Sequence, residues 1–255
     1  MTAASDGIPR VIRLDLAYHG GPFHGFAANR GVPTVEGLLR RALGRVLGHE
    51  PDLAVAGRTD KGVHARAQVV SFTTPRDDLD LDRLVISLSA LCAPAVVITS
   101  AAWAPPDFHA RFSARSRSYL YRVLDAPVGD PLRADQVWHV RTALDLEAMN
   151  RGAADLVGEN DFTSFCRRPK HPPGASLVRG VTEAGWERVG DEARFRISAN
   201  AFCHQMVRAV VGAMIEIGRG RRTPDLIGEM IRRADRTGAP SLAPPHGLVL
   251  TAVGY

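Results

Sequence analysis

The order of apolar patterns in the first hundred residues constrains the fold most strongly. Residues 11–18 alternate, with Ile12, Leu14 and Leu16 on one side, which is typical of a half-buried strand. The patterns that follow predict further elements in this order: a helix after the N-cap residue Thr34, strands at 53–56 and 67–73, a helix at 81–91 and a strand at 96–103. The resulting order, β-α-β-β-α-β, is that of the ferredoxin-like split unit.

The second half of the chain repeats this plan less regularly. Its patterns predict the following elements: strand 118–124, helix 146–157, strands 177–188 and 193–199 joined by a turn, helices 203–218 and 224–234, and strand 248–255. A surface loop with three prolines is expected at 168–175. We therefore predict an α+β protein with a mostly antiparallel central sheet. Its two ferredoxin-like halves are 1–105, which carries the candidate catalytic loop, and 106–255.

Composition favours a globular chain. The 255 residues are 45% hydrophobic, which suffices for one large core or two smaller ones. The best candidate for a membrane helix, 206–217, is interrupted by Arg208, Gly212 and Glu216, so no membrane span is expected. The first ten residues lack the basic start and apolar stretch of a secretion signal. We therefore expect a cytoplasmic protein.

The cysteines predict neither a disulfide framework nor a zinc site. Cys92, Cys166 and Cys203 are few and far apart in the sequence, and none belongs to a CxxC pair. Cys203 stands next to His204, and we interpret this pair as a helix start beside a core position rather than as metal ligands. No metal and no cofactor are expected.

The charge is compatible with a polyanionic partner. The net charge is +5, and thirty of the 32 basic residues are arginine. Arginine contacts phosphate through two hydrogen bonds at once and stacks on bases, so an RNA ligand would explain this bias. A GC-rich genome would explain it equally well.

The stretch Gly57–Ala65 carries the candidate chemistry. It places the carboxylate of Asp60 between the cations of Arg58 and Lys61, and it lies between two apolar strands. Glycines at positions 57 and 62 permit a tight turn and the close approach of a ligand. A loop held by two core strands is a rigid platform for catalytic groups. The alternative is a turn in which the Asp60 side chain binds its own backbone.

Arg208 is a second candidate on the helix predicted at 203–218. His204, Arg208 and Gly212 form a stripe at i, i+4 spacing beside an apolar face. An arginine near Asp60 would favour the ionised carboxylate and lower its pKa. The alternative is a solvated arginine.

The sequence around Asp60, AGRTDKGVHA, resembles the active-site signature of the TruA family of tRNA pseudouridine synthases. By this resemblance Asp60 is the catalytic aspartate, and Arg58 helps to extrude the target nucleotide. Tyr119 matches the tyrosine that stacks on the target base, and Arg208 matches the partner of the aspartate. Other segments that resemble family motifs span most of the chain: 34–39, 108–115, 161–165 and 202–212.

The resemblance implies the pseudouridine synthase fold and an isomerase, an intramolecular transferase, that acts on tRNA. The family converts uridine to pseudouridine at positions 38–40 of the anticodon stem-loop, without cofactor or metal, and its members are homodimers. Residues expected to contact the substrate are Lys61, His64, Arg66, Arg111, Arg115 and His204.

Two departures from the family pattern leave alternatives open. Gly25-Phe26-Ala27 replaces the usual Gly-Trp-Gln, which bears on how RNA is gripped there. Alanines rather than glycines flank Asn200. The alternatives are an RNA-binding or RNA-folding module without catalysis, and a C-glycoside-forming enzyme that acts on another RNA or on a free nucleotide. A hydrolase that pairs Asp60 with His64 lacks a second catalytic carboxylate.

Overall fold

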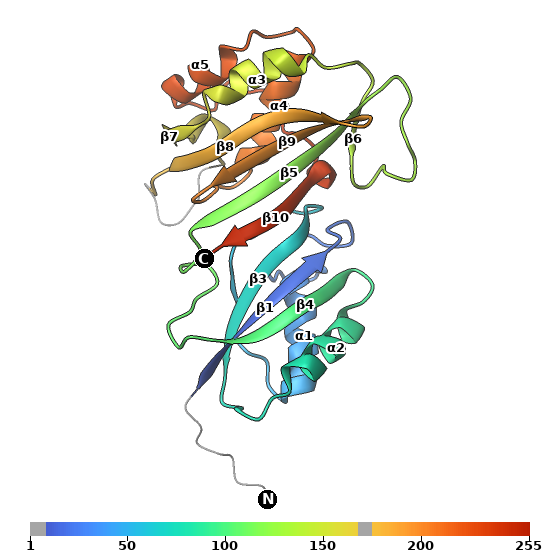
Figure 1. Cartoon of the computed structure of the whole chain (residues 1–255), viewed down its shortest axis with the longest axis vertical. Helices are drawn as coiled ribbons and strands as arrows, with labels where there is room; N and C mark the ends of the chain where they lie inside the picture. The colour runs from blue at the N-terminus through green and yellow to red at the C-terminus, as the bar shows by residue number, and fades with distance from the viewer. Residues whose placement is uncertain (1–8, 168–174) are drawn as a thin grey trace, which may run out of the picture. The chain divides into compact units, whose positions relative to one another are not determined.

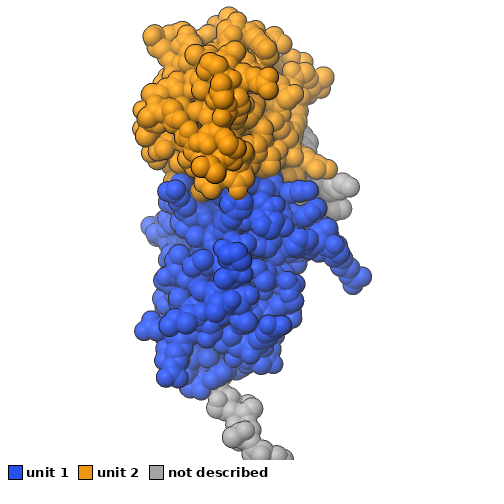
Figure 2. Space-filling model, turned by 90° about the vertical axis from the view of Figure 1, so that its right-hand side faces the viewer, with its two compact units in different colours: residues 1–115, 250–255 blue, residues 116–249 orange. Residues whose placement is uncertain are grey.

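A computed structural model describes residues 9–167 and 175–255 as a mixed α/β protein. This part of the chain holds ten strands, mostly antiparallel, and five α-helices. The chain divides into two compact units, which Figure 2 colours separately: unit 1 contains 1–115 with 250–255, and unit 2 contains 116–249. The proposed division at residue 105 stays a prediction, and most of the loop expected at 168–175 lies outside the described residues.

Unit 1 contains the elements in the order expected from the sequence. They are β1 (Arg10–Tyr18), α1 (Val35–Leu47), β2 (Ala54–Val55), β3 (His64–Thr74), α2 (Leu81–Cys92) and β4 (Val96–Ala104). Strand β1 is antiparallel to both β3 and β4, and the short β2 pairs with β3. Strand β10 (Leu248–Gly254) is the neighbour of β3. Helices α1 and α2 pack against each other and lie together beside β1 and β4 (Figure 1).

Local chemistry explains where the first helix begins and ends. The side-chain oxygen of Thr34 accepts a hydrogen bond from the backbone nitrogen of Gly37 at 3.2 Å, so the predicted N-cap is confirmed. Gly48 follows the helix with φ +82°, a left-handed conformation that favours glycine. The face between these ends buries Leu39 and Leu43 completely, and this burial directs the helix toward the core.

Unit 2 combines an antiparallel sheet with three helices. Its strands are β5 (Ser116–Asp125), β6 (Trp138–Val140), β7 (Gly158–Asp161), β8 (Val178–Val189) and β9 (Glu192–Ala199). Its helices are α3 (Leu146–Ala154), α4 (Met206–Gly218) and α5 (Leu226–Arg233), with short 3-10 turns η1 (Thr163–Phe165) and η2 (Pro245–Gly247). The strand order is β5-β9-β8-β7, and β6 runs parallel to β5. Helices α3 to α5 pack together beside β8 and β9 (Figure 1).

Several boundaries in unit 2 differ from the sequence-based expectation. The helix expected at 203–218 begins at Met206, because Gln205 has φ +68° and cannot be part of a right-handed helix. The helix expected at 146–157 ends at Ala154. Strands β6 and β7 were not predicted, since three and four residues are too few to show a period. The turn between β8 and β9 is confirmed, with Gly190 at φ +59°.

A buried carboxylate ties the β8–β9 hairpin to β5. Glu192 accepts hydrogen bonds from Arg122 at 2.9 and 2.5 Å and from Arg194 at 2.9 Å. Burial opposes ionisation of Glu192, but these hydrogen bonds outweigh it and lower its pKa. Arg133, from the loop after β5, adds a further ion pair with Glu192. Three arginines therefore compensate the buried negative charge of Glu192.

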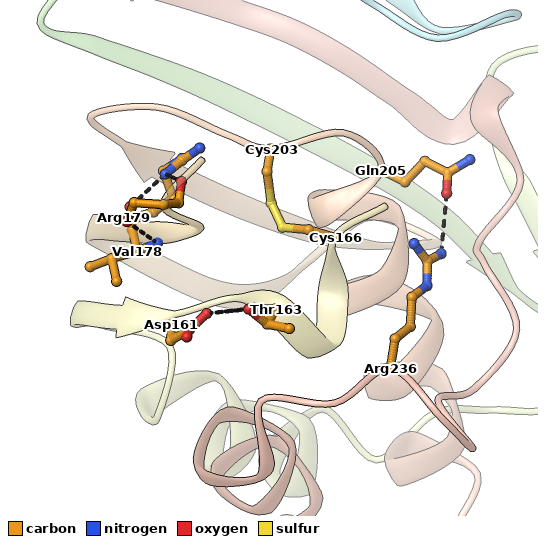
Figure 3. Close-up of a disulfide and its surroundings, with 9 residues drawn as sticks. Asp161, Thr163, Cys166, Val178, Arg179, Cys203, Gln205 and Arg236 are labelled. Carbon is orange, nitrogen blue, oxygen red and sulfur yellow. Dashed lines mark hydrogen bonds between the residues drawn. A yellow bond between two sulfur atoms is a disulfide. The ribbon is translucent and has the colours of Figure 1, made fainter. Parts of the chain in front are cut away.

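A disulfide joins Cys166 to Cys203, although the sequence analysis expected no disulfide framework (Figure 3). The two residues are 37 positions apart, and their Cα atoms are 5.7 Å apart, which suits a disulfide. The cross-link connects the end of η1 to the segment before α4. Beside it the backbone nitrogen of Arg167 donates to the carbonyl of His204 at 3.0 Å. No pattern in the sequence indicates this pair, because the two cysteines lie in segments that only the fold brings together.

Within residues 9–167 and 175–255, no group of three or more His, Cys, Asp or Glu side chains is arranged to hold a metal ion. In the same residues no helix is both long and apolar enough to cross a membrane.

We predict that Cys203→Ser lowers the free energy of unfolding by about 2–4 kcal/mol under oxidising conditions, because the cross-link restricts the unfolded chain. Urea unfolding with and without dithiothreitol measures this difference, which should vanish in the reductant. Cys92→Ser is the control: it removes the buried thiol outside the disulfide, so its effect should be the same in both conditions. Three reactive thiols in the oxidised, unfolded wild type would contradict the cross-link.

Candidate active site

The Asp60 loop connects β2 to β3 in unit 1. Asp60 is half-buried, whereas Arg58 and Lys61 on either side of it are exposed. The backbone nitrogen of Val63 donates to the carbonyl of Asp60 at 3.1 Å, and Gly62 completes this turn at φ +81°. A backbone hydrogen bond therefore closes the turn, and the carboxylate of Asp60 lies in sequence between the cations of Arg58 and Lys61.

Buried hydroxyl groups anchor this loop to the sheet beneath it. The hydroxyl of Tyr18 on β1 lies 2.7 Å from the side-chain oxygen of Thr59, the residue before Asp60. The amide nitrogen of Gln68 on β3 donates to that tyrosine oxygen at 3.2 Å and to the carbonyl of Gly57 at 2.7 Å. Burial raises the pKa of Tyr18 to about 12, so its hydroxyl stays neutral and keeps these hydrogen bonds.

The segment after β1 closes against the other side of the loop. The backbone nitrogen of Phe26 donates to the carbonyl of Thr59 at 3.0 Å. Gly25 has φ +103°, and a Cβ there would lie 3.0 Å from the same carbonyl oxygen. At Gly20 a Cβ would lie 2.1 Å from the carbonyl oxygen of Val63. Glycine is required at both positions because backbone meets backbone.

The structure explains one departure from the family pattern. Phe26 is fully buried, and its ring centroid lies 6.2 Å from that of Tyr18. The aromatic residue at this position therefore belongs to the core under the Asp60 loop. A substitution at this position therefore changes the packing beneath the loop rather than an exposed contact.

The expected substrate contacts in unit 1 differ in exposure. His64 is buried, and its Nδ1 accepts a hydrogen bond from the backbone nitrogen of Gly20 at 3.0 Å. Its ring also packs on that of His19 at a centroid distance of 4.5 Å. By contrast, the exposed residues of this group are Lys61, Arg66, Arg111 and Arg115. His64 therefore supports the loop, whereas the four other residues are open to solvent.

In unit 2, β5 carries the two tyrosines of the sequence motif. Tyr119 is 9% exposed, and the ring of Phe202 meets it edge-on at 5.0 Å and 88°. Tyr121 is fully buried, and its hydroxyl donates to the carbonyl of Pro244 at 2.7 Å. Burial raises the pKa of Tyr121 far above its usual value, and the charge of Arg208 opposes this only in part. Tyr121 is thus a structural residue, and Tyr119 is the partly accessible ring.

Arg208 projects from α4 and is held by the segment before β10. Its Nε donates to the carbonyl of Ala243 at 2.8 Å, and the backbone nitrogen of Ala243 donates back to the carbonyl of Arg208 at 3.0 Å. One turn later, a Cβ at Gly212 would lie 2.0 Å from the carbonyl oxygen of Ser241. The glycine expected beside Arg208 therefore permits this close approach. His204, before the helix, is exposed.

Sequence reasoning missed several supporting residues. The pattern did not single out Tyr18 and Gln68 as loop anchors, because their partners lie 41 and 11 residues away. Ala243 and Pro244 were missed for the same reason. Among the expected site residues, unit 1 brings together Arg58, Asp60, Lys61 and His64, and unit 2 contains Tyr119, His204 and Arg208.

The comparisons with known proteins agree with one another. A family model described as tRNA pseudouridine synthase matches residues 153–255. The tRNA pseudouridine synthase A of Frankia casuarinae is 44% identical, over 98% of this chain and 91% of that protein. The enzymes of the same name from Caulobacter sp. (39%; 97% and 98%) and Halalkalibacterium halodurans (38%; 93% and 90%) are also similar.

The chain belongs to the tRNA pseudouridine synthase A family. It is an isomerase that converts uridine to pseudouridine in tRNA. A solved Cbf5-Nop10-Gar1 complex is also similar, at 13% identity and a TM-score of 0.35, over 94% of this chain and 49% of that one. A score this low carries no conclusion about the synthase fold.

We predict that Gly20→Ala displaces the Asp60 loop of this synthase, because the added Cβ would overlap the carbonyl of Val63. Pseudouridine formation should fall about a hundredfold, which is the typical effect of a displacement of about 1 Å near a reacting centre. A tritium-release assay on labelled tRNA and a thermal melt measure the two consequences. Gly185→Ala is the matched control, since its Cβ would meet a side-chain oxygen at 3.6 Å, an ordinary contact. Unchanged turnover by Gly20→Ala would contradict the assigned loop geometry.

Proposed function

We propose that this synthase modifies uridines 38–40 of the tRNA anticodon stem-loop, with Asp60 as the catalytic carboxylate. One observation carries the assignment of Asp60. Its loop matches the family signature, and a buried hydrogen bond at Thr59 and a partly buried one at Gly57 hold it against the sheet. A catalytic group needs a fixed position, and this loop provides it.

The reaction is redox-neutral and suits a carboxylate. The N1–C1′ bond of uridine breaks, the base turns, and C5 forms a bond to C1′. C5 loses its proton, and N1 gains one. An ionised Asp60 can attack C1′, stabilise a cationic sugar or remove a sugar proton. Each route requires the carboxylate beside the sugar of the target nucleotide, and none requires a cofactor.

Two further residues act on the extruded nucleotide in this proposal. Leaving the base stack costs roughly a few kcal/mol. Exposed Arg58 enters the space that the base vacates. Tyr119 stacks on the base, which contributes about 1–3 kcal/mol. Its edge-on contact with Phe202 orients the ring for this purpose.

We also propose Arg208 as the cationic partner of Asp60. The motif match supports this pairing, and the two residues come from different units. Within unit 2, the hydrogen bond to Ala243 fixes the direction of the guanidinium group. The exposed cations Lys61, Arg66, Arg111 and Arg115 bind phosphate, and the exposed His204 is a further contact. The buried His64 acts on the substrate only through the loop that it supports.

The family resemblance extends the proposal to the whole molecule. We propose that the chain forms two ferredoxin-like halves of the pseudouridine synthase fold and works as a homodimer in the cytoplasm. The order β4-β1-β3, with β2 on β3 and two helices packed together, supports this description for the first half.

We predict that Asp60→Asn abolishes turnover and leaves folding and most RNA affinity intact, because only the charge of the side chain changes. Tritium release from unmodified tRNA labelled at C5 of uridine measures turnover, and filter binding measures affinity. Asp77→Asn, in an exposed loop, is the matched control and should be fully active. An active Asp60→Asn variant would refute the catalytic assignment. Binding of tRNA without release by the wild type would favour a binding module.

We predict that Arg208→Ala lowers both activity and stability, the latter by about 1–3 kcal/mol through loss of the hydrogen bond to Ala243. Tritium release from labelled tRNA measures turnover, and urea unfolding measures stability. Arg219→Ala, just after the same helix, is the control and should leave turnover unchanged. A fully active and fully stable Arg208→Ala variant would show that the proposed role is wrong.

A further inference from the structure

Phe112 is placed unlike every other large aromatic residue of the described chain. Its side chain is 75% exposed, whereas every other described Phe, Tyr or Trp is buried or half-buried. It lies in the segment between β4 and β5. A single exposed apolar side chain is common on protein surfaces, so what distinguishes Phe112 is the set of residues around it.

The backbone around Phe112 is held rigidly in unit 1. The fully buried Ala110 donates through its backbone nitrogen to the side-chain oxygen of Ser71 at 3.0 Å. Its carbonyl accepts from the hydroxyl of Tyr255 at 2.8 Å. Two hydrogen bonds between His109 and Ser113 close the segment, at 3.0 and 2.9 Å. Phe112 therefore projects from a rigidly held backbone segment.

Two neighbours give the ring the character of a nucleobase-stacking site. The guanidinium of Arg111 lies over the Phe112 ring, 5.3 Å from its centroid. The ring of His109 lies on it at 4.4 Å with a tilt of 31°. The His109 Nδ1 accepts from the backbone nitrogens of Arg111 and Phe112, which locks the histidine in place. Aromatic rings combined with arginine are the means by which proteins hold unpaired bases.

The contacts that hold this segment also connect it to the Asp60 loop. Ala110 packs in one cluster with Val69 and with Ala56, the residue just before Gly57. Both segments therefore rest on the same part of β3 within unit 1. A base held on Phe112 would be positioned relative to the loop that carries the carboxylate.

We propose that Phe112, flanked by His109 and Arg111, is a preformed platform on which an unpaired base of the tRNA substrate stacks, outside the nucleotide that reacts. This inference rests on the proposed function, because it assumes that the reacting nucleotide of the tRNA lies beside Asp60. The platform is already ordered before RNA arrives, so binding does not have to order it.

The test compares Phe112 variants on unmodified tRNA transcript. Phe112→Ala should raise KM about tenfold, equivalent to about 1.4 kcal/mol, and leave kcat within about twofold of wild type. Phe112→Trp should retain the wild-type KM, and its added indole fluorescence should be quenched on tRNA binding. Phe112→Leu, which is apolar but not aromatic, should behave like Phe112→Ala. Leu132→Ala, 88% exposed in unit 2, is the matched control and should equal wild type.

Several outcomes would overturn the platform without touching the proposed function. A wild-type KM in Phe112→Ala would do so, as would full rescue by Phe112→Leu, which indicates a merely apolar contact. A changed sedimentation coefficient in Phe112→Ala would identify a contact between subunits instead. Arg111→Ala should reduce the salt dependence of binding by about one phosphate contact, whereas Phe112→Ala should leave it unchanged. Failure of the proposed function itself would appear as full turnover by Asp60→Asn, or as pseudouridine at positions other than 38–40.

Discussion

The hydrogen bond between the hydroxyls of Tyr18 and Thr59, 2.7 Å long, determines where the Asp60 loop lies. Gln68 reaches the same tyrosine and also the carbonyl of Gly57, so adjacent strands hold the loop at both sides of Arg58. The side chains of Tyr18, Thr59 and Gln68 are buried, and an unmatched buried polar group would cost about 1–3 kcal/mol. The loop cannot leave this position without exposing them. Asp60 thus sits at the end of a fixed chain of hydrogen bonds.

Unit 2 orients its proposed site residues by comparable means. Arg208 and Ala243 exchange hydrogen bonds, and Gly212 lets the neighbouring segment come close enough to make them. The disulfide between Cys166 and Cys203 restrains the segment that carries Phe202, whose ring supports Tyr119. In both units, hydrogen bonds to backbone carbonyls position these residues, and glycines allow the backbone segments to approach closely. The charged residues themselves remain half-buried or exposed, where a polyanionic substrate can reach them.

Much of the fold could be predicted, and the exceptions have physical reasons. The alternation at 11–18 and the cap at Thr34 are local signals, so the elements of unit 1 appeared in the right order. Strands β6 and β7 were missed because their few residues depend on pairing with distant strands. Helix α4 begins three residues late because Gln205 adopts a left-handed conformation. The Cys166–Cys203 pair was missed because sequence distance says little about spatial distance.

The sequence by itself determined the family, the order of elements in the first half and the identity of the candidate catalytic groups around Asp60. Those conclusions rest on local residue patterns, which need no knowledge of distant contacts. Only the tertiary structure decided that His64 and Phe26 are buried supports, that Tyr18 and Gln68 anchor the loop, and that Phe112 is exposed on a rigid base. Burial and hydrogen bonding depend on segments that are far apart in the chain, and folding alone brings those segments together.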